Sequence, residues 1–502
     1  MFPCERDPLR FACRGVITAA VLLFGLLKPV DGGAQTSPVT FARDVAPILF
    51  QHCASCHQPE GHAPFSVLSY ADVRPRAAQI ASSVTSRDMP PWKPEPGYGV
   101  FAGERRLSDE QIDVIQRWVR DGAREGARAD LPPPPRLAAG WQLGPPDLVV
   151  GLPEYVLPAG GVDEFRNFVV HVPGTGTRYV RGLEFHPNSP NVHHANVFVD
   201  PTATSRKLDD EDPLPGYDGV IPYSAAFPDG HFLGWTPGLI APLEPKEQAW
   251  RLEAGSDLLV QLHMVHRETP QRVASSIGLY FTPTPPTRTP AMLRLGRQNL
   301  DIPAGEPMYM TSDSYVLPVD AEIQAVQAHA HYRARDVKAW ATLPDGGRQW
   351  LINISRWDFN WQDQYRYASP FWLPAGTRLT LEYVFDNSAA NRRNPDSPPR
   401  RVVWGQRSRD EMADLWIQMS TRSERELTRL SADLRRKMIT EDIVGHEMEI
   451  RSNPDSVVLH NDVAVLYLEA EQPAQAGAHG DLRRPGGRRS SPASRGNPCS
   501  CA

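Results

Sequence analysis

Three features are scarce in this sequence, and each scarcity excludes a class of protein. Cysteine is absent from positions 57 to 498, so the body of the chain must fold without disulfide bridges. Long basic runs are also absent and the net charge is −6, which argues against nucleic acid as a partner because phosphate binding requires clustered Lys and Arg. The apolar run near the start, Gly15 to Leu27, is too short for a comfortable membrane span.

The first 34 residues have the order of a secretory signal peptide. Arginines at positions 6, 10 and 14 precede the apolar run, and the small residues Gly32, Gly33 and Ala34 follow it. We therefore expect an exported protein, periplasmic or secreted, with an N-terminal membrane anchor as the alternative if the segment stays uncleaved. The cysteines at 4 and 13 leave with this segment, and those at 499 and 501 lie in an unpatterned tail. Only Cys53 and Cys56 remain for central chemistry.

These two cysteines belong to the segment HCASCH at residues 52–57, which has the CxxCH spacing of a haem c attachment site. In that arrangement two thiols bond to the vinyl groups of the haem, and the next side chain, here His57, binds the iron. A disulfide is the alternative. Met89 is the only methionine between the signal segment and residue 264, and we predict that it is the sixth iron ligand. His52 and His62 are the alternative ligands, and an exposed loop position is the alternative for Met89.

A helix is predicted after this site. The segment LSDEQIDVIQRWVRDG opens with a capping box of Ser108 and Gln111 and places Ile112, Ile115 and Val119 on one stripe. With the CxxCH site, it makes residues 39–127 resemble a small, all-α class I cytochrome c domain. The prolines of LPPPP at 131–135 indicate a stiff linker, which we assign to residues 128–147.

The pattern of the chain changes at about residue 148. From there to residue 422, short alternating apolar runs are separated by Pro, Gly, Asn and Asp, which is typical of β-sandwiches. The length suits two all-β, jelly-roll-type sandwiches in tandem, at 148–285 and 286–422. A helical segment is predicted at 423–476, part of which resembles the first helix pair of a tetratricopeptide repeat, and residues 477–502 are predicted to be disordered.

Two histidines lie close together on a predicted strand of this body. In AVQAHAHYR, His329 and His331 share one strand face, while Val326, Ala328 and Ala330 face a core. Both imidazoles could therefore reach one point. A metal ion is one explanation, and two ordinary surface histidines are the other.

Further candidate ligands lie on other predicted strands. His263 points away from the apolar face of DLLVQLHMVH, and Met412, Asp414 and Trp416 point away from that of RDEMADLWIQM. All of these side chains are expected on the less buried side of their strands. His193 and His194 are neighbours, which point apart on a regular strand, so they can reach one ion only through a local twist.

Ligand type limits the metal that these residues could hold. Imidazoles suit copper, zinc, iron or nickel, whereas a thioether ligand selects Cu(I). Two histidines with Met412 therefore favour copper, with zinc as the alternative. For each residue taken alone, an ordinary structural position is the other interpretation.

The order HH, H, HxH and M over two predicted sandwiches resembles the copper type II, ascorbate-dependent monooxygenases, the family of peptidylglycine hydroxylating and dopamine β-monooxygenases. The segments GSDLLVQLHMVH, AHAHYR and SRDEMADLWIQM also match the surroundings of the family's motifs, over roughly residues 150–422. The resemblance implies two copper ions, one held by His193, His194 and His263, and a catalytic one held by His329, His331 and Met412. It further implies that O2 reacts at the second copper and that the first supplies an electron.

The sequence also departs from this family. Animal members are rich in disulfides, and this body has no cysteine. In the peptide-hydroxylating members an Arg, an Asn and a Tyr hold the substrate carboxylate, and the corresponding positions here, Gln327, Asp414 and Trp416, offer no cationic clamp. We predict that these three residues line a substrate pocket and that glycine-extended peptides are not the substrate. Efficient peptide amidation by the purified protein would contradict this.

We therefore expect an exported, haem- and copper-containing oxidoreductase, an O2-dependent copper monooxygenase. Its substrate is an unidentified small organic or peptide molecule, and its electron donor is ascorbate or a redox protein, with electrons passing through the fused haem. One alternative is a haem and copper electron-transfer or copper-binding protein without hydroxylase activity. Another is a purely structural pair of sandwiches that serves adhesion.

Overall fold

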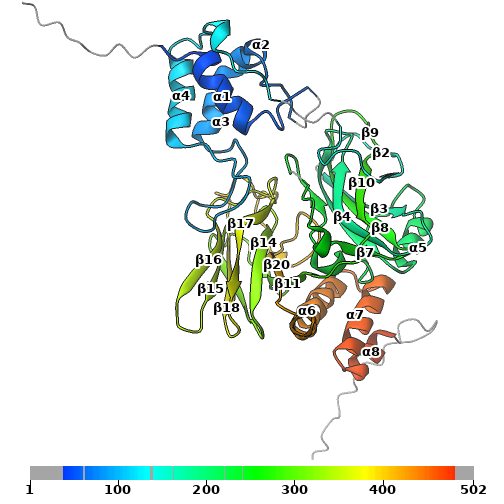
Figure 1. The fold of residues 1–502 in the computed structure, drawn as a ribbon. Helices are drawn as coiled ribbons and strands as arrows, with labels where there is room; N and C mark the ends of the chain where they lie inside the picture. The colour runs from blue at the N-terminus through cyan, green and yellow to red at the C-terminus, as the bar shows by residue number, and fades with distance from the viewer. Residues whose placement is uncertain are drawn as a thin grey trace, which may run out of the picture.

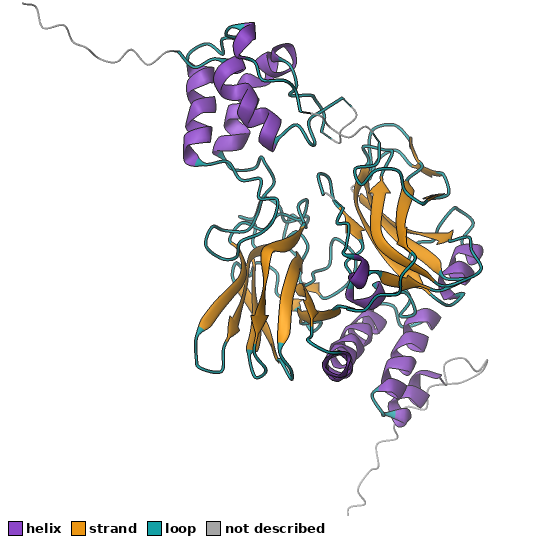
Figure 2. Cartoon of the chain, in the orientation of Figure 1, coloured by secondary structure: helices purple, strands orange, loops and turns teal. Residues whose placement is uncertain are grey.

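The computed structural model describes residues 38–59, 63–135, 140–161, 163–219, 221–239 and 241–480. Over these ranges the chain is built mostly from β-sheets, with short helices at one end and longer helices at the other (Figure 1; Figure 2). This confirms the predicted β-sandwiches and C-terminal helical segment. Among the described helices, none is long and apolar enough to cross a membrane. The predicted signal segment and His62 lie outside the described residues.

Short helices form the N-terminal part of the described chain. They are a π-helical turn Phe41–Val45, α1 (Ala46–His52), α2 (Tyr70–Val73), a 3-10 turn Arg74–Arg76, α3 (Ala77–Thr85), α4 (Asp109–Arg120) and a 3-10 turn Arg128–Asp130. The predicted capping box of α4 is present. However, the helix buries Trp118, rather than Val119, together with Ile112 and Ile115. The larger indole fills the centre of this core, where its ring lies 6.2 Å from that of Phe41.

Two antiparallel sheets form the first sandwich. One has the strand order β1 (Leu148–Gly151), β10 (Ser276–Thr282), β4 (Arg178–His186), β7 (Trp250–Leu252), and the other β3 (Asp163–His171), β8 (Asp257–Val265), β5 (Val192–Asp200), β6 (Gly234–Trp235). Smaller elements are the pair β2 (Tyr155–Leu157) and β9 (Gln271–Val273), α5 (Thr204–Glu211) and two 3-10 turns, Pro228–Gly230 and Lys246–Gln248. Alternate residues of β8, such as Leu258, Val260 and Leu262, pack into the core between the sheets.

The second sandwich repeats this architecture. Its sheets have the orders β11 (Ala291–Gly296), β20 (Asp414–Ser420), β14 (Ala321–His329), β17 (Gln364–Leu373), and β13 (Tyr309–Val316), β18 (Arg378–Phe385), β15 (Ala334–Thr342), β16 (Arg348–Ile354). A short pair, β12 (Asp301–Ile302) and β19 (Val402–Val403), lies outside these sheets. As predicted, Val326 and Ala328 of β14 and Ala330 after it face the core, as do Leu415 and Ile417 of β20.

The C-terminal segment consists of α6 (Glu424–Ser452), α7 (Val457–Glu469) and α8 (Pro473–Gly480). Leu430 and Leu434 of α6 join the core of the second sandwich. The Arg294 guanidinium of β11 forms an ion pair with Asp442 of α6. Helix α6 is therefore part of the folded body. Helix α8 extends to Gly480, beyond the position at which disorder was predicted to begin, and residues 481–502 lie outside the described residues.

The helical N-terminal part rests on the second sandwich through the loop 89–106. Ala102 donates its N–H to the Arg366 carbonyl at 2.8 Å, and the Val100 carbonyl accepts from Ala368 at 2.9 Å. The Phe101 ring stacks on that of Tyr367 at 5.0 Å. These contacts fix the CxxCH segment relative to the sheets.

Part of the predicted linker is anchored rather than free. The backbone N–H groups of Gln142 and Leu143 donate to the Glu184 carboxylate of β4 at 2.7 and 3.1 Å. The Trp141 ring stacks on His186 at 3.8 Å. The end of this segment therefore belongs to the first sandwich, because its backbone donors find their acceptor there.

Candidate metal and haem sites

The first histidine cluster lies on two neighbouring strands of the first sandwich. His193 and His194 belong to β5, and His263 lies across from His194 on β8. The pairing of the two strands shifts between Val192 and His194, and such a bulge turns adjacent side chains toward the same side. This irregularity is the local twist that the sequence analysis required, so the three imidazoles meet.

The nitrogen atoms of this first cluster have the spacing of ligands to one ion. The Nδ1 atom of His194 lies 3.3 Å from Nδ1 of His193 and 3.3 Å from Nδ1 of His263. All three residues offer ligand atoms within 4.8 Å of one another. Two nitrogens that bind one ion tetrahedrally at about 2.0 Å are themselves about 3.3 Å apart. The cluster therefore has the geometry of a three-nitrogen metal site.

A carboxylate determines which nitrogen of His263 is free. The Nε2 atom of His263 lies 3.1 Å from Oδ2 of Asp163, and an ionised carboxylate only accepts hydrogen bonds. Nε2 therefore carries the hydrogen, and Nδ1 keeps a lone pair toward the cluster. Burial alone would raise the pKa of Asp163, but hydrogen bonds from His263 and Ser408 outweigh it and lower this pKa. Carboxylates orient metal-binding histidines in this way.

The second histidine cluster lies at the end of β14, and its free nitrogens are Nε2 atoms rather than Nδ1 atoms. The Nδ1 atom of His329 faces the side-chain oxygen of Gln362 at 2.5 Å, and Nδ1 of His331 faces the Asp410 carbonyl at 3.0 Å. Because both partners are acceptors, each Nδ1 carries the hydrogen and each Nε2 keeps its lone pair. The two rings lie 5.3 Å apart.

Met412 is brought to the second cluster by the pairing of β14 with β20. Asp414 pairs with His329 in these antiparallel strands. Met412, two residues before Asp414, therefore lies on the same side as His331, which is two residues after His329. The buried Glu411 carboxylate fixes this corner by accepting the backbone N–H groups of His331 and Arg333 at 3.0 and 2.7 Å. Met412 lines the same cavity as both histidines.

Burial favours the neutral form of histidines in both clusters. It lowers the pKa of His193 and of His329 to about 4, and that of His331 to about 3. Burial and the neighbouring His263 also lower the pKa of His194 well below its usual value. Neutral imidazoles are the form that binds metals.

The expectation that these side chains lie on the less buried side of their strands is wrong for His263, His331 and Asp414, of which only 1%, 2% and 1% is exposed. His329, Met412 and Trp416 are half-buried. The sequence shows which face is apolar, but not that the other sandwich and α6 cover the opposite face.

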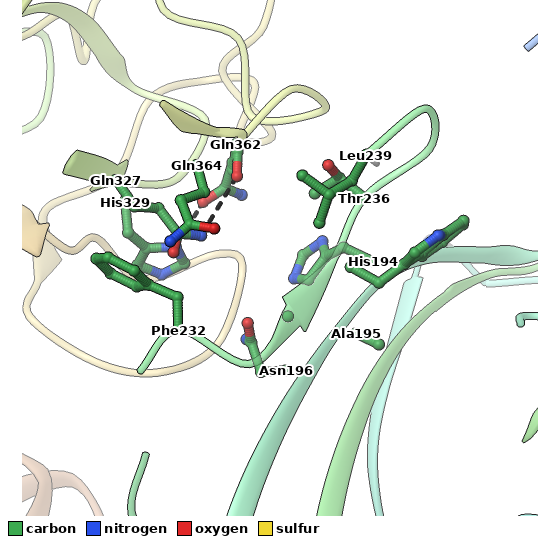
Figure 3. A pocket seen from close by; sticks show the side chains of 12 residues that line it. His194, Ala195, Asn196, Phe232, Thr236, Leu239, Gln327, His329, Gln362 and Gln364 are labelled. Carbon is green, nitrogen blue, oxygen red and sulfur yellow. Dashed lines mark hydrogen bonds between the residues drawn. The ribbon is translucent and has the colours of Figure 1, made fainter. Parts of the chain in front are cut away.

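One aromatic ring connects the two clusters. The ring centroid of Phe359 lies 5.4 Å from that of His263 and 5.6 Å from that of His331. In addition, a chamber of about 30 Å³, large enough for a water molecule, lies between His194 and His329 (Figure 3). Its other polar lining residues are Asn196, Thr236, Gln327, Gln362 and Gln364. The clusters therefore face each other across a small polar space.

A larger cavity of about 530 Å³ adjoins both clusters. The three residues of the predicted substrate pocket, Gln327, Asp414 and Trp416, line it together with Met412. Helix α6 contributes a wall that the sequence analysis did not foresee, with Leu427, Leu434, Met438, Asp442 and His446. Burial raises the pKa of Asp414 to about 6, although Arg294 opposes the shift. Within the described chain, its Oδ1 atom has no hydrogen-bond partner.

The CxxCH segment follows α1. Cys53 and Cys56 are free and half-buried, and burial raises the pKa of Cys53 to about 12. The Nδ1 atom of His57 faces the Phe65 carbonyl at 3.0 Å, so Nδ1 carries the hydrogen and Nε2 is free. Met89 is half-buried after α3, and its N–H donates to the Ser83 carbonyl at 3.2 Å. Its role as an iron ligand stays a prediction.

The donor sets fit the groups that the sequence predicts. Three imidazole nitrogens suit copper or zinc, and two imidazoles beside a thioether suit copper. Two thiols and an imidazole with a free Nε2 suit a covalently attached haem. Sequence reasoning missed the groups that orient these donors, namely Asp163, Phe359, Gln362 and Glu411. Of these, only Glu411 lies within a segment that predicts a ligand, SRDEMADLWIQM.

Comparison with known proteins identifies no relative. No family model matches the chain, and no curated protein matches it. Among solved structures, it is similar to the major capsid protein P2 of bacteriophage PM2, with 10% identity, 55% of this chain and 99% of that chain covered, and a TM-score of 0.21. It is also similar to PNGF-II, with 9% identity, 54% and 65% covered, and a TM-score of 0.22. Scores this low carry no argument about function.

Proposed function

We propose that this chain is an exported oxidoreductase that holds haem c and two copper ions and hydroxylates an organic substrate with O2. One observation carries the proposal: two histidine clusters with different free nitrogens, one of them beside Met412, adjoin a single cavity of about 530 Å³. The order of these donors along the chain is that of the copper type II, ascorbate-dependent monooxygenases.

The chain's own residues prepare both clusters for a metal. Asp163 holds the Nε2 hydrogen of His263, whereas Gln362 and the Asp410 carbonyl hold the Nδ1 hydrogens of His329 and His331. These three imidazoles are thereby each fixed in one tautomer before a metal arrives. Copper bound there would supply two one-electron redox centres for the reduction of O2.

The larger cavity supplies the substrate site. Trp416, Met438 and Leu434 give it apolar walls, and α6 forms one side of it. Asp414 is the polar group closest in the strand pairing to His329. A substrate with an apolar body and a polar group would fit this lining, because apolar side chains share it with Asp414 and Gln327.

The N-terminal helices supply the electron donor. Haem c would be held by Cys53, Cys56, His57 and Met89, and would replace or supplement ascorbate as the reductant. We also propose that the chain is exported, to the periplasm or outside the cell, because such a haem is attached there.

The test is substrate-dependent oxygen uptake. Holoprotein with reduced haem is mixed with a panel of mainly apolar organic molecules under ¹⁸O2, and products are analysed by mass spectrometry. We expect incorporation of one labelled oxygen, lost in His331→Ala and in His263→Ala, and retained in Met310→Ala, whose side chain is 60% exposed. Copper binding with haem-to-copper electron transfer but no labelled product from any substrate would favour the alternative of a pure electron-transfer protein.

A further inference from the structure

Arg105 and Asp363 join three parts of the chain at one point. Arg105, from the loop before α4, forms an ion pair with Asp363, from the loop before β17. Arg105 Nη1 also donates to the Gly238 carbonyl at 2.8 Å. Thr236 Oγ1 donates to the Asp363 carboxylate at 2.8 Å. The helical part and both sandwiches therefore meet at this pair.

One end of this junction touches the CxxCH segment. Gly238 packs so closely on Cys56 that an added Cβ would lie 2.6 Å from the cysteine sulfur. The backbone φ of Gly238 is +85°, a conformation that glycine adopts readily. A loop of the first sandwich is thus in direct contact with a thiol that would carry the haem.

The other end touches the second histidine cluster. Asp363 follows Gln362 in the chain, and Gln362 accepts the Nδ1 hydrogen of His329 at 2.5 Å. The Gln362 backbone carbonyl also accepts from Gln327. The path from Cys56 to His329 passes through the contact with Gly238, the hydrogen bond from Arg105 to the Gly238 carbonyl, and the ion pair of Arg105 with Asp363. It continues along the chain from Asp363 to Gln362 and through the hydrogen bond between Gln362 and His329.

We infer that Arg105 and Asp363 are positioning residues that fix the CxxCH segment relative to His329, and that Gly238, Arg105, Asp363 and Gln362 form the electron route between haem and the second cluster. The inference rests on the proposed function. In the step, one electron leaves ferrous haem, which becomes ferric, and one cupric ion at the second cluster becomes cuprous. No bond or proton is transferred.

Other contacts hold the same parts of the chain together, so the route can be broken without separating them. Arg356 Nη1 donates to the Ser86 carbonyl at 2.8 Å, and Lys93 forms an ion pair with Asp358 at 3.5 Å. Phe101 stacks on Tyr367. Asp363→Asn, which keeps the shape of the side chain, is therefore expected to fold, and Arg356→Ala is a matched control because it removes an interdomain contact away from the route.

The experiment is anaerobic stopped-flow measurement of haem oxidation in holoprotein that holds ferrous haem and cupric copper. We expect the first-order rate to fall at least about tenfold in Asp363→Asn, because the half-buried Arg105 loses its buried, charged partner. Gly238→Ala should also slow it, whereas Arg356→Ala should not. The haem potential and the copper electron paramagnetic resonance signal should match those of the parent protein. In copper-free protein, Asp363→Asn should increase amide hydrogen exchange at residues 236–239.

Three results would overturn the inference, and they differ in what else they overturn. A rate in Asp363→Asn equal to that in Arg356→Ala would remove the route but leave the proposed function intact. A rate that rises with protein concentration would show transfer between chains, with the same consequence. Absence of bound copper at the second cluster, read from the resonance signal before mixing, would overturn both the route and the proposed function.

Discussion

The two histidine clusters are built on equivalent sandwiches, yet they prepare their ligands differently. In the first, Asp163 binds Nε2 of His263 and leaves Nδ1 free, whereas in the second, neutral oxygens bind Nδ1 of His329 and His331 and leave Nε2 free. The first offers only nitrogen, and the second adds the Met412 thioether. The comparison teaches that the orienting partner, rather than the histidine itself, decides which lone pair a site offers.

The largest expected effect is the loss of one metal ion. His263→Ala removes a central ligand of the first cluster, and His331→Ala one of the second, so each variant should retain one of two copper ions per chain. Elemental analysis after reconstitution measures this. His266→Ala is the matched control, since His266 lies three residues after His263 but hydrogen-bonds to the Pro158 carbonyl, and it should retain both ions. If either ligand variant kept both ions, the clusters would not be separate sites.

A smaller effect is expected from the orienting groups. Asp163→Asn and Gln362→Ala should each weaken copper binding at their own cluster by about 10- to 100-fold, as second-sphere changes commonly do. Asp163→Asn should have the larger effect, because a carboxylate raises the basicity of its histidine more than an amide does. Competition with a chelator measures each affinity, with the other cluster removed by His331→Ala or His263→Ala. Equal losses at both clusters in one variant would contradict the assignment.

A still smaller effect is expected on the pH dependence of the stability of the metal-free protein. The pKa values of His193 and His329 are lowered to about 4 and that of His331 to about 3, from an ordinary value of 6.5. Between these values the unfolded chain binds protons that the folded chain does not. These histidines therefore stabilise the fold fully above about pH 6.5, and this contribution is lost as the pH drops toward 4, whereas the raised pKa of Asp414 contributes with the opposite sign. Urea denaturation of the parent protein and of His329→Gln/His331→Gln measures the histidine contribution as the difference between their pH profiles. Identical profiles would show that the second cluster is not buried as described.

The sequence predicts the alternating faces of the strands and little of what lies against them. For β14 and β20 the apolar periodicity correctly separates Val326 and Leu415 from the histidines, whereas Met412 both lines the cavity and packs against the core. The convergence of His193 with His194 depends on a bulge, which the pattern does not encode. Phe359, Gln362 and Asp163 lie in no recognisable pattern, because their roles arise from contacts between segments far apart in the chain. The position of α6 at the cavity also arises from contacts between distant segments, so no sequence pattern predicts it.

The most direct test of the account is copper X-ray absorption on the haem-loaded, reduced protein. The account predicts a copper–sulfur contribution equal to one sulfur per two copper ions. This signal should disappear in Met412→Ala and persist in Met310→Ala. A sulfur signal that survives Met412→Ala, or that is missing from the parent protein, would contradict the claim that His329, His331 and Met412 share one ion.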